Sequence, residues 1–89
     1  MFNNYPNPFN PTTNISYSVA NKGNVELSIY NIKGQLVKKY QQSNQNPGNY
    51  SIIWNGFDMN NNKVSSGMYL YKLKNNGKSI DTKKMLLIK

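Results

Sequence analysis

Few side chains in this 89-residue sequence could carry out acid–base or nucleophilic chemistry. There is no His and no Cys, and the only carboxylates are Glu26, Asp58 and Asp81. Ser–His and Cys–His catalysis need a base beside the nucleophile, and paired-carboxylate hydrolysis needs two acids at a controlled separation. Glu26 falls in an alternating pattern, on the side expected to face solvent, and no motif supports a Ser–Lys pair. We therefore expect a protein that is not an enzyme.

Asp58 opens the one stretch that is similar to a metal-binding loop. Residues 58–62 read DMNNN and begin the calcium pattern D-x-[DN]-x-[DN], but Lys63 stands where the pattern has Gly, and no bidentate Glu follows. Asp side chains also cap polar turns by accepting hydrogen bonds from the backbone that follows. We interpret Asp58 as such a cap, and we expect neither a metal nor another cofactor.

Composition restricts the partners. The net charge is +8, from eleven Lys against three acidic residues, which favours an acidic partner. Seven Tyr could stack on nucleic-acid bases, but base-edge recognition depends on Arg, which is absent, so we expect no nucleic acid. No segment approaches the ~20 apolar residues of a membrane helix, so we expect no transmembrane segment.

The elements that would position these residues are all strands. No stretch keeps a 3.6-residue apolar period, whereas alternating apolar residues recur at strand-like spacing. A polar loop is expected at 43–49 and an irregular segment at 55–66. Strands are expected at residues 13–19, 25–30, 35–42, 50–54, 67–74 and 79–88.

These strands predict an all-β fold, an immunoglobulin-like antiparallel β-sandwich of about seven strands. Gly34 and the Asn76-Gly77 pair predict hairpin turns, and Tyr69 fits a tyrosine corner. The facing of residues 35–42 stays open, because Leu36 and Val37 lie on opposite sides. The predicted core comprises Ile15, Tyr17, Val25, Leu27, Ile29, Ile52, Trp54, Tyr69 and Tyr71.

The first twelve residues are unusually rich in proline. Pro6, Pro8 and Pro11 restrict their own φ angles and push the preceding residues toward extended geometry. We expect residues 1–12 to form a lead-in strap, held on the sandwich of residues 13–89 by Phe9 and Tyr5. The alternative is a semi-rigid linker.

Four segments together resemble a known family. They read YPNPFNPTT, YNIKGQLV, WNGFDMNNNKVSSGMYLYKL and KKMLLIK. In this order and spacing they resemble the type A C-terminal sorting domains of the type IX secretion system, and also the related immunoglobulin-like domain of flagellar hook-capping proteins. The matching motif residues are Pro6, Asn7, Pro8, Gly34, Trp54, Gly56, Asp58, Gly67 and Tyr69.

The resemblance implies that residues 13–89 are a sorting domain, preceded by a cargo domain. An outer-membrane translocon would recognise the domain, and a surface peptidase would remove it. The protein would then pass through the periplasm to the outer-membrane surface or the medium. Two alternatives remain: a structural scaffold module, as in hook assembly, and a carbohydrate-binding accessory domain. The latter needs exposed aromatic residues.

The final segment is basic and apolar on both faces, which an ordinary last strand does not need. We expect it to contact the translocon, by strand addition or by side-chain docking. The predicted partner-binding residues are Lys83, Lys84, Met85, Leu86, Leu87, Ile88 and Lys89.

Overall fold

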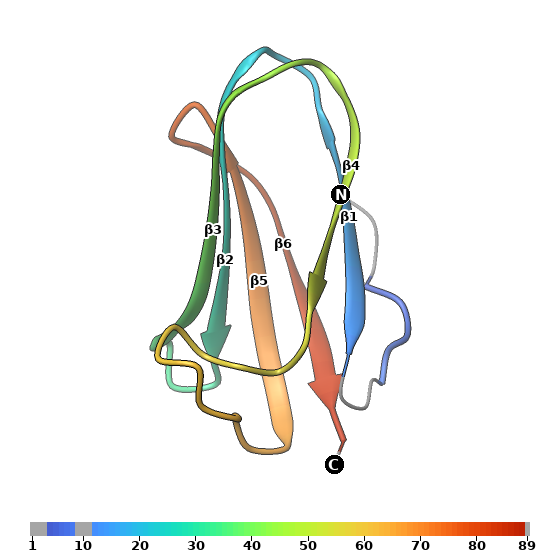
Figure 1. Cartoon of the computed structure of the whole chain (residues 1–89), viewed down its shortest axis with the longest axis vertical. Coiled ribbons are helices and arrows are strands. Elements are labelled where there is room, and N and C mark those ends of the chain that lie inside the picture. The colour runs from blue at the N-terminus through green and yellow to red at the C-terminus, as the bar shows by residue number, and fades with distance from the viewer. Residues whose placement is uncertain (1–3, 9–11, 89) are drawn as a thin grey trace.

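The computed structural model describes residues 4–8 and 12–88, which form two antiparallel sheets packed face to face (Figure 1). Alternating apolar residues give each strand one face that must be covered, which explains the two layers. The described residues contain no helix long and apolar enough to cross a membrane. The strands are β1 (Thr13–Val19), β2 (Gly23–Asn31), β3 (Leu36–Gln45), β4 (Gly48–Trp54), β5 (Gly67–Asn75) and β6 (Lys78–Leu87).

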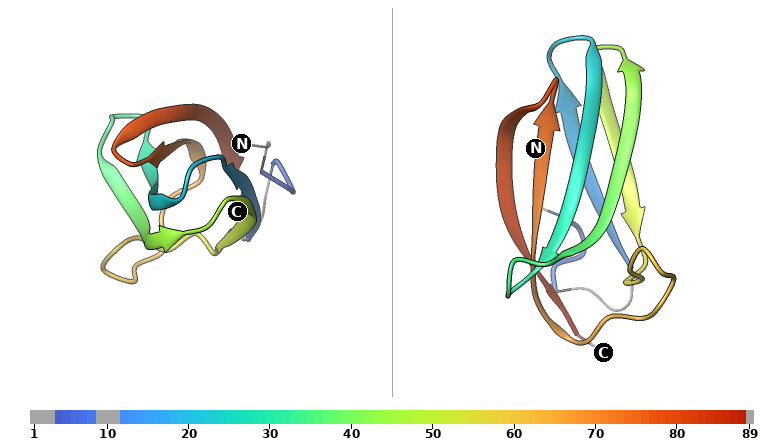
Figure 2. Two further views of the ribbon diagram at one scale, coloured as in Figure 1. Left: turned by 90° about the horizontal axis from the view of Figure 1, so that it is seen from above. Right: turned by 90° about the vertical axis from the view of Figure 1, so that its left-hand side faces the viewer.

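The two sheets differ in size. Among the six strands, β1 pairs only with β4, whereas the other four strands form a sheet in the order β3-β2-β5-β6 (Figure 2). The architecture is the predicted immunoglobulin-like sandwich, with six strands among the described residues rather than about seven. The polar loop expected at 43–49 shrinks to residues 46–47, because β3 continues to pair with β2 by backbone as far as Gln45 opposite Gly23.

The core follows the predicted alternation, with one exception. Eight of the nine predicted core residues are buried, but Ile52 is only half-buried. Among the described strands, β4 has a partner on one side only, so Ile52 lies at the margin of the sandwich. The core also contains Val19, Val37, Leu73, Met85 and Leu87.

A bulge in β3 decides the facing that the sequence left open. Tyr30 pairs with Leu36 and Ile29 with Lys38, so Val37 is the extra residue between them. An extra residue shifts the alternation by one position. Val37 therefore points inward at 8% exposed, while Leu36 faces outward at 46%.

Two turns have the predicted conformations. Gly34 has φ of 81° and donates its N–H to the carbonyl of Asn31 at 3.0 Å, closing the β2–β3 hairpin. Asn76 and Gly77 have φ of 53° and 78° and close the β5–β6 hairpin. The Asn76 side chain also packs on Gly23, whose missing Cβ leaves room for it.

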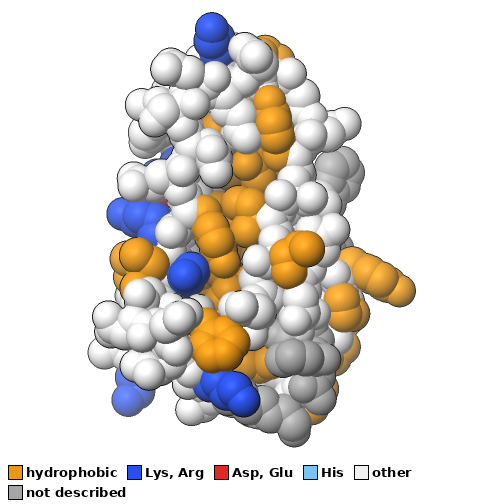
Figure 3. All heavy atoms as spheres, viewed as in Figure 1, with side chains coloured by type: hydrophobic (Ala, Val, Ile, Leu, Met, Phe, Trp, Pro, Cys, Tyr) orange, Lys and Arg blue, Asp and Glu red, His pale blue; other side chains and the backbone are white. Residues whose placement is uncertain are grey.

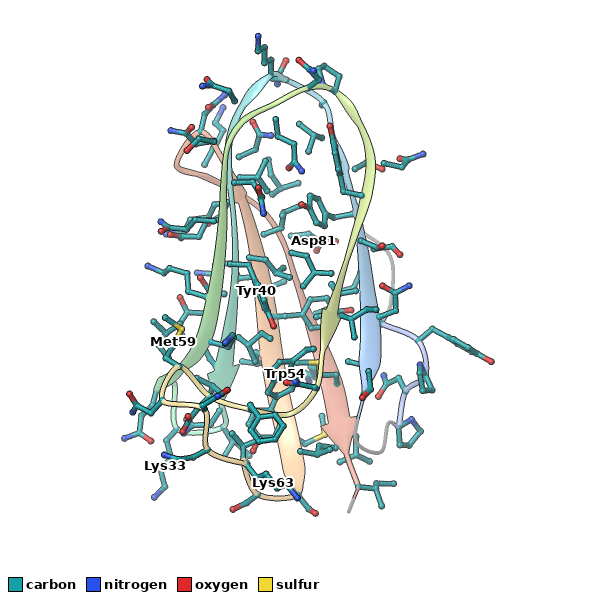
Figure 4. The ribbon with its side chains drawn as sticks, in the orientation of Figure 1. Lys33, Tyr40, Trp54, Met59, Lys63 and Asp81 are labelled. Atoms are coloured by element: carbon teal, nitrogen blue, oxygen red, sulfur yellow. The ribbon has the colours of Figure 1, made fainter. Side chains whose placement is uncertain are left out.

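Four strands facing two leave the sandwich open between β3 and β4. Figure 3 shows a stripe of apolar side chains on this side of the molecule. In Figure 4, Tyr40 of β3 points into this space, and Trp54 lies deeper, at the end of β4. The half-buried apolar residues that pack against the core are Tyr40, Tyr50, Ile52 and Val64.

Trp54→Ala tests the core. Trp54 is fully buried and packs edge-on against Tyr69, with ring centroids 5.3 Å apart. We expect the substitution to lower the free energy of unfolding by about 3–5 kcal/mol, as aromatic truncations in cores do. Denaturant unfolding measures this loss. The control is Ile53→Ala in the same strand, whose side chain is 66% exposed; equal losses in the two variants would contradict the assignment.

Candidate functional site

The start of the described chain, residues 4–8, forms a strap between β1 and β6 (Figure 1). Tyr5 pairs with Asn14 of β1 through two backbone hydrogen bonds, of 2.9 and 2.8 Å. The Asn7 side-chain oxygen accepts the backbone N–H of Leu86 in β6 at 3.0 Å. The strap is thus bonded to one strand of each sheet.

Asn4 anchors the strap from the inside. It is 3% exposed, and its backbone N–H donates to the Tyr71 hydroxyl at 2.9 Å. Its side-chain amide donates to Thr13 Oγ1 at 2.9 Å and to the carbonyl of Pro6 at 3.1 Å. Thr13, itself buried, donates to the same carbonyl at 2.9 Å. These paired groups stabilise the strap on the sandwich, whereas the buried Asn4 Oδ1 accepts no hydrogen bond from the described residues.

The anchor differs from the one predicted. The Tyr5 side chain is 81% exposed, so only its backbone joins the sandwich, and Phe9 lies outside the described residues. Sequence reasoning missed Asn4 because one Asn among many carries no burial signal. The motif residues Pro6, Asn7 and Pro8 are exposed, and the peptide bonds before both prolines are cis.

The pKa of Tyr71 is shifted where its hydroxyl meets the strap. Burial raises the pKa of Tyr71 above its ordinary value, the hydrogen bond from Asn4 offsets part of this rise, and the negative charge of Asp81 adds to it. Burial likewise raises the pKa of Tyr40 and Tyr69. The Tyr71 phenol oxygen accepts the Asn4 N–H, and its own O–H stays a donor.

The predicted partner-binding segment does not form one surface. Met85 and Leu87 are each 1% exposed, which contradicts their assignment to a binding surface. They pair with Tyr69 and Gly67 of β5 and share the inward face with Tyr69. From the sequence alone, the last strand has apolar residues on both of its faces. The β5–β6 register shows that Met85 and Leu87 belong to the core.

The other described members of that segment face opposite sides of the sheet. Lys83 lies on the inward side, where its Nζ is 3.9 Å from a carboxylate oxygen of Asp81. Lys84, Leu86 and Ile88 alternate with the core residues and face outward, and Ile88 is 47% exposed. Strand addition at Leu86 would have to displace Asn7, which already occupies that backbone donor. Lys89 lies outside the described residues.

The remaining motif residues build the loop between β4 and β5. Gly56 has φ of 80°, and its carbonyl accepts the Val64 N–H at 3.0 Å. Trp54 Nε1 donates to the carbonyl of Phe57 at 2.9 Å, which ties the loop to the core. At its far end, the Tyr69 hydroxyl donates to the carbonyl of Ser65 at 2.6 Å, as the predicted tyrosine corner requires.

Asp58 has the predicted capping role. Its Oδ1 accepts the backbone N–H groups of Asn60 and Asn62, both at 2.9 Å. Asn61 between them has φ of 66°, the left-handed conformation that Asn tolerates. No group of three or more potential metal-ligating side chains occurs within residues 4–8 and 12–88.

The same loop covers the edge of β3, which sequence reasoning did not predict. The Met59 N–H donates to the carbonyl of Val37 at 3.0 Å, and the Lys39 N–H donates to Met59 Sδ at 3.3 Å. Figure 4 shows Met59 beside β3. The loop therefore closes the lower part of the open side, near the bulge.

The aromatic residues that a carbohydrate-binding surface would need lie inside. Trp54, Tyr69 and Tyr71 are buried, and Tyr50 is half-buried against Tyr17, with stacked rings whose centroids are 5.8 Å apart. These four residues therefore form no exposed row.

Asp58→Ala tests the cap. Loss of two hydrogen bonds should lower the free energy of unfolding by about 1–2 kcal/mol, whereas Asp58→Asn keeps an acceptor oxygen and should lose less. Thermal melts with excess calcium and with chelator should coincide. A rise of several degrees with calcium would indicate a metal site instead.

Thr13→Val tests the strap. The substitution keeps the shape of the side chain but leaves the buried Asn4 amide short of an acceptor. We expect a loss of about 1–3 kcal/mol in the free energy of unfolding, and faster amide hydrogen exchange at Leu86. Thr82→Val, at an exposed position of β6, is the matched control. Unchanged exchange at Leu86 in the Thr13 variant would show that Thr13 does not hold the strap.

Comparison with known proteins identifies relatives of this sandwich. Its structure is similar to that of FlgD from P. aeruginosa, with a TM-score of 0.68 and 26% identity over 84% of this chain and 59% of that chain. It is also similar to FlgD from Xanthomonas campestris, with a TM-score of 0.66 and 21% identity over 85% of this chain and 55% of that one.

A third similar structure is PorZ, a surface component of the type IX secretion system of Porphyromonas gingivalis. Its TM-score is 0.66 and its identity 22%, over 98% of this chain but only 11% of PorZ. The chain therefore spans less than two thirds of each of these proteins. No curated protein matches the sequence. Residues 9–79, most of the chain, match the model of the FlgD Ig-like domain, and the chain therefore belongs to that family.

Proposed function

We propose that this chain is a non-enzymatic structural module, which joins a larger protein to an assembly in the cell envelope. The observation that carries the proposal is the match of residues 9–79 to the FlgD Ig-like domain. The similar FlgD of Xanthomonas campestris acts in the hook capping that is essential for flagellar assembly. A hook-cap-like scaffold role is the function that this similarity favours.

The use of the carboxylates supports a structural role. Glu26 pairs with Lys39 at 3.2 Å, Asp58 caps its loop, and Asp81 accepts the N–H of Thr82 at 2.8 Å. These are the only three carboxylate side chains of the sequence. Each is thus engaged in local structure, at a different place in the fold, which favours binding over acid–base chemistry.

Sorting by the type IX secretion system is the second candidate. It is supported by the motifs of the strap, the β4–β5 loop and the C-terminal segment, and by the similarity to PorZ, which extends over 98% of this chain. In this role the domain would follow a cargo domain, bind the outer-membrane translocon, and be removed by a surface peptidase. The protein would be periplasmic in transit and then exposed at the outer surface or released.

One experiment distinguishes the two candidates. An epitope tag is placed in the exposed turn at Lys33 of the parent protein, in the cells that make it. We expect the mature assembly to retain the tag, and deletion of residues 1–89 to prevent incorporation. Loss of the tag from an otherwise exported protein would favour the sorting role. Normal incorporation without residues 1–89 would contradict both.

A carboxylate-free variant tests the non-enzymatic role. Glu26→Gln, Asp58→Asn and Asp81→Asn together remove every side-chain carboxylate while keeping acceptor oxygens. Incorporation of the tagged protein should persist. If the variant keeps its melting temperature but is no longer incorporated, a carboxylate has a chemical role that the proposal does not contain.

A further inference from the structure

The outer faces of the two sheets differ in chemistry. On the β1–β4 sheet, the register places Asn14 beside Ile53, Ser16 beside Ser51, and Ser18 beside Asn49. These side chains alternate with buried neighbours and face outward. Except for Ile53, this outer face is polar and uncharged.

The register places five apolar side chains next to one another, as a patch, on the outer face of the four-stranded sheet. Tyr30 of β2 pairs with Leu36 of β3 and with Leu70 of β5, and Met68 of β5 pairs with Leu86 of β6. Partners directly opposite in an antiparallel sheet point to the same face and lie in contact range. Leu36 is 46% and Met68 40% exposed, and the other three are half-buried.

Lysines border this patch. The register places Lys39 and Lys72 on either side of Ser28, Lys74 opposite Glu26, and Lys84 opposite Leu70. Ser28 faces outward yet is only 2% exposed, consistent with long lysine stems lying over it. We call Lys39, Lys72, Lys74 and Lys84 the lysine border.

The charge of the border is mostly unopposed on this face. Glu26, the acidic residue in these rows, forms an ion pair with Lys39 at 3.2 Å. Lys72, Lys74 and Lys84 then remain as positive charges beside exposed apolar side chains. Such a surface is complemented by apolar groups facing the patch and by carboxylates facing the lysines.

The patch continues onto the strap. Asn7 and Pro8 line a shallow hollow together with Met68, Lys84 and Leu86. Since Asn7 already occupies the edge of β6, an incoming protein meets the sheet face and the strap rather than a free strand edge. Two features that lie at opposite ends of the sequence therefore form one surface.

We propose that this outer face is the docking surface for a folded protein whose contact region is apolar at its centre and rich in Asp and Glu around it. The inference rests on the proposed function, because a structural module needs a partner. Three of the five apolar side chains are half-buried in a sheet face, whereas binding at a membrane interface requires apolar groups that enter the lipid boundary. An acidic protein surface therefore fits better than a lipid surface.

The test uses the full parent protein in the cells that make it. The photo-crosslinking residue p-benzoylphenylalanine is placed at Leu36 or Leu70 in the patch, and at Ser16 or Ser51 on the opposite face as matched controls. We expect a protein adduct from the patch positions only, with Asp and Glu near the crosslinked position of the partner. Adducts with lipid, with a second copy of this chain, or equally from both faces would overturn the proposal.

The crosslinked protein is then purified and titrated with charge variants. Lys72→Glu with Lys84→Glu should weaken binding at least tenfold, and binding should weaken as salt rises, because charges near the surface are screened. The control is Lys22→Glu, between β1 and β2, with Lys78→Glu, at the start of β6. These positions lie at the opposite end of the strands from the patch, and their change should leave the affinity unchanged. Equal melting temperatures show that both variants fold. An affinity insensitive to the first pair would overturn the proposal.

Failure of this inference is distinguishable from failure of the proposed function. If the tagged domain is incorporated normally but the patch yields no adduct, the docking face is wrong and the structural role stands. If residues 1–89 are dispensable for incorporation, the structural role itself is wrong.

Discussion

Four strands face two in this sandwich, and the core between them stays dry only if other segments cover the sides. The strap closes the side between β1 and β6, where it is bonded to both strands. The β4–β5 loop closes the lower part of the side between β3 and β4, through Met59. A domain of this size buries little apolar surface in total, so the fold depends on both covers.

Polar side chains help to hold these covers in place. Asn4 and Thr13 bind the strap from within, and Asp58 organises the loop through its carboxylate. Buried or semi-buried hydrogen bonds are directional, so they determine where an irregular segment lies as well as stabilising it. Two of the motif residues act in this way, Asn7 in the strap and Asp58 in the loop.

The positive charge of the chain is unevenly distributed over the sandwich. The small sheet presents serine and asparagine, whereas the large sheet presents lysines next to exposed apolar residues. Lysine on an edge strand also discourages edge-to-edge aggregation, and this protection explains Lys39 of β3 and Lys84 of β6. It does not explain Lys72 and Lys74 of the inner strand β5, which share a face with the apolar patch and favour a specific acidic partner.

The sequence by itself determined the strands, their inward faces and the turns, because period-two alternation and Gly or Asn at left-handed positions are local signals. It also determined the Asp58 cap and the Tyr69 corner, whose partners lie within four residues along the chain. Only the tertiary structure decided the facing of Leu36, the burial of Met85 and the role of Asn4. These depend on a bulge, on register and on hydrogen bonds between residues up to 79 positions apart, such as Asn7 and Leu86, which leave no periodic signal in the sequence.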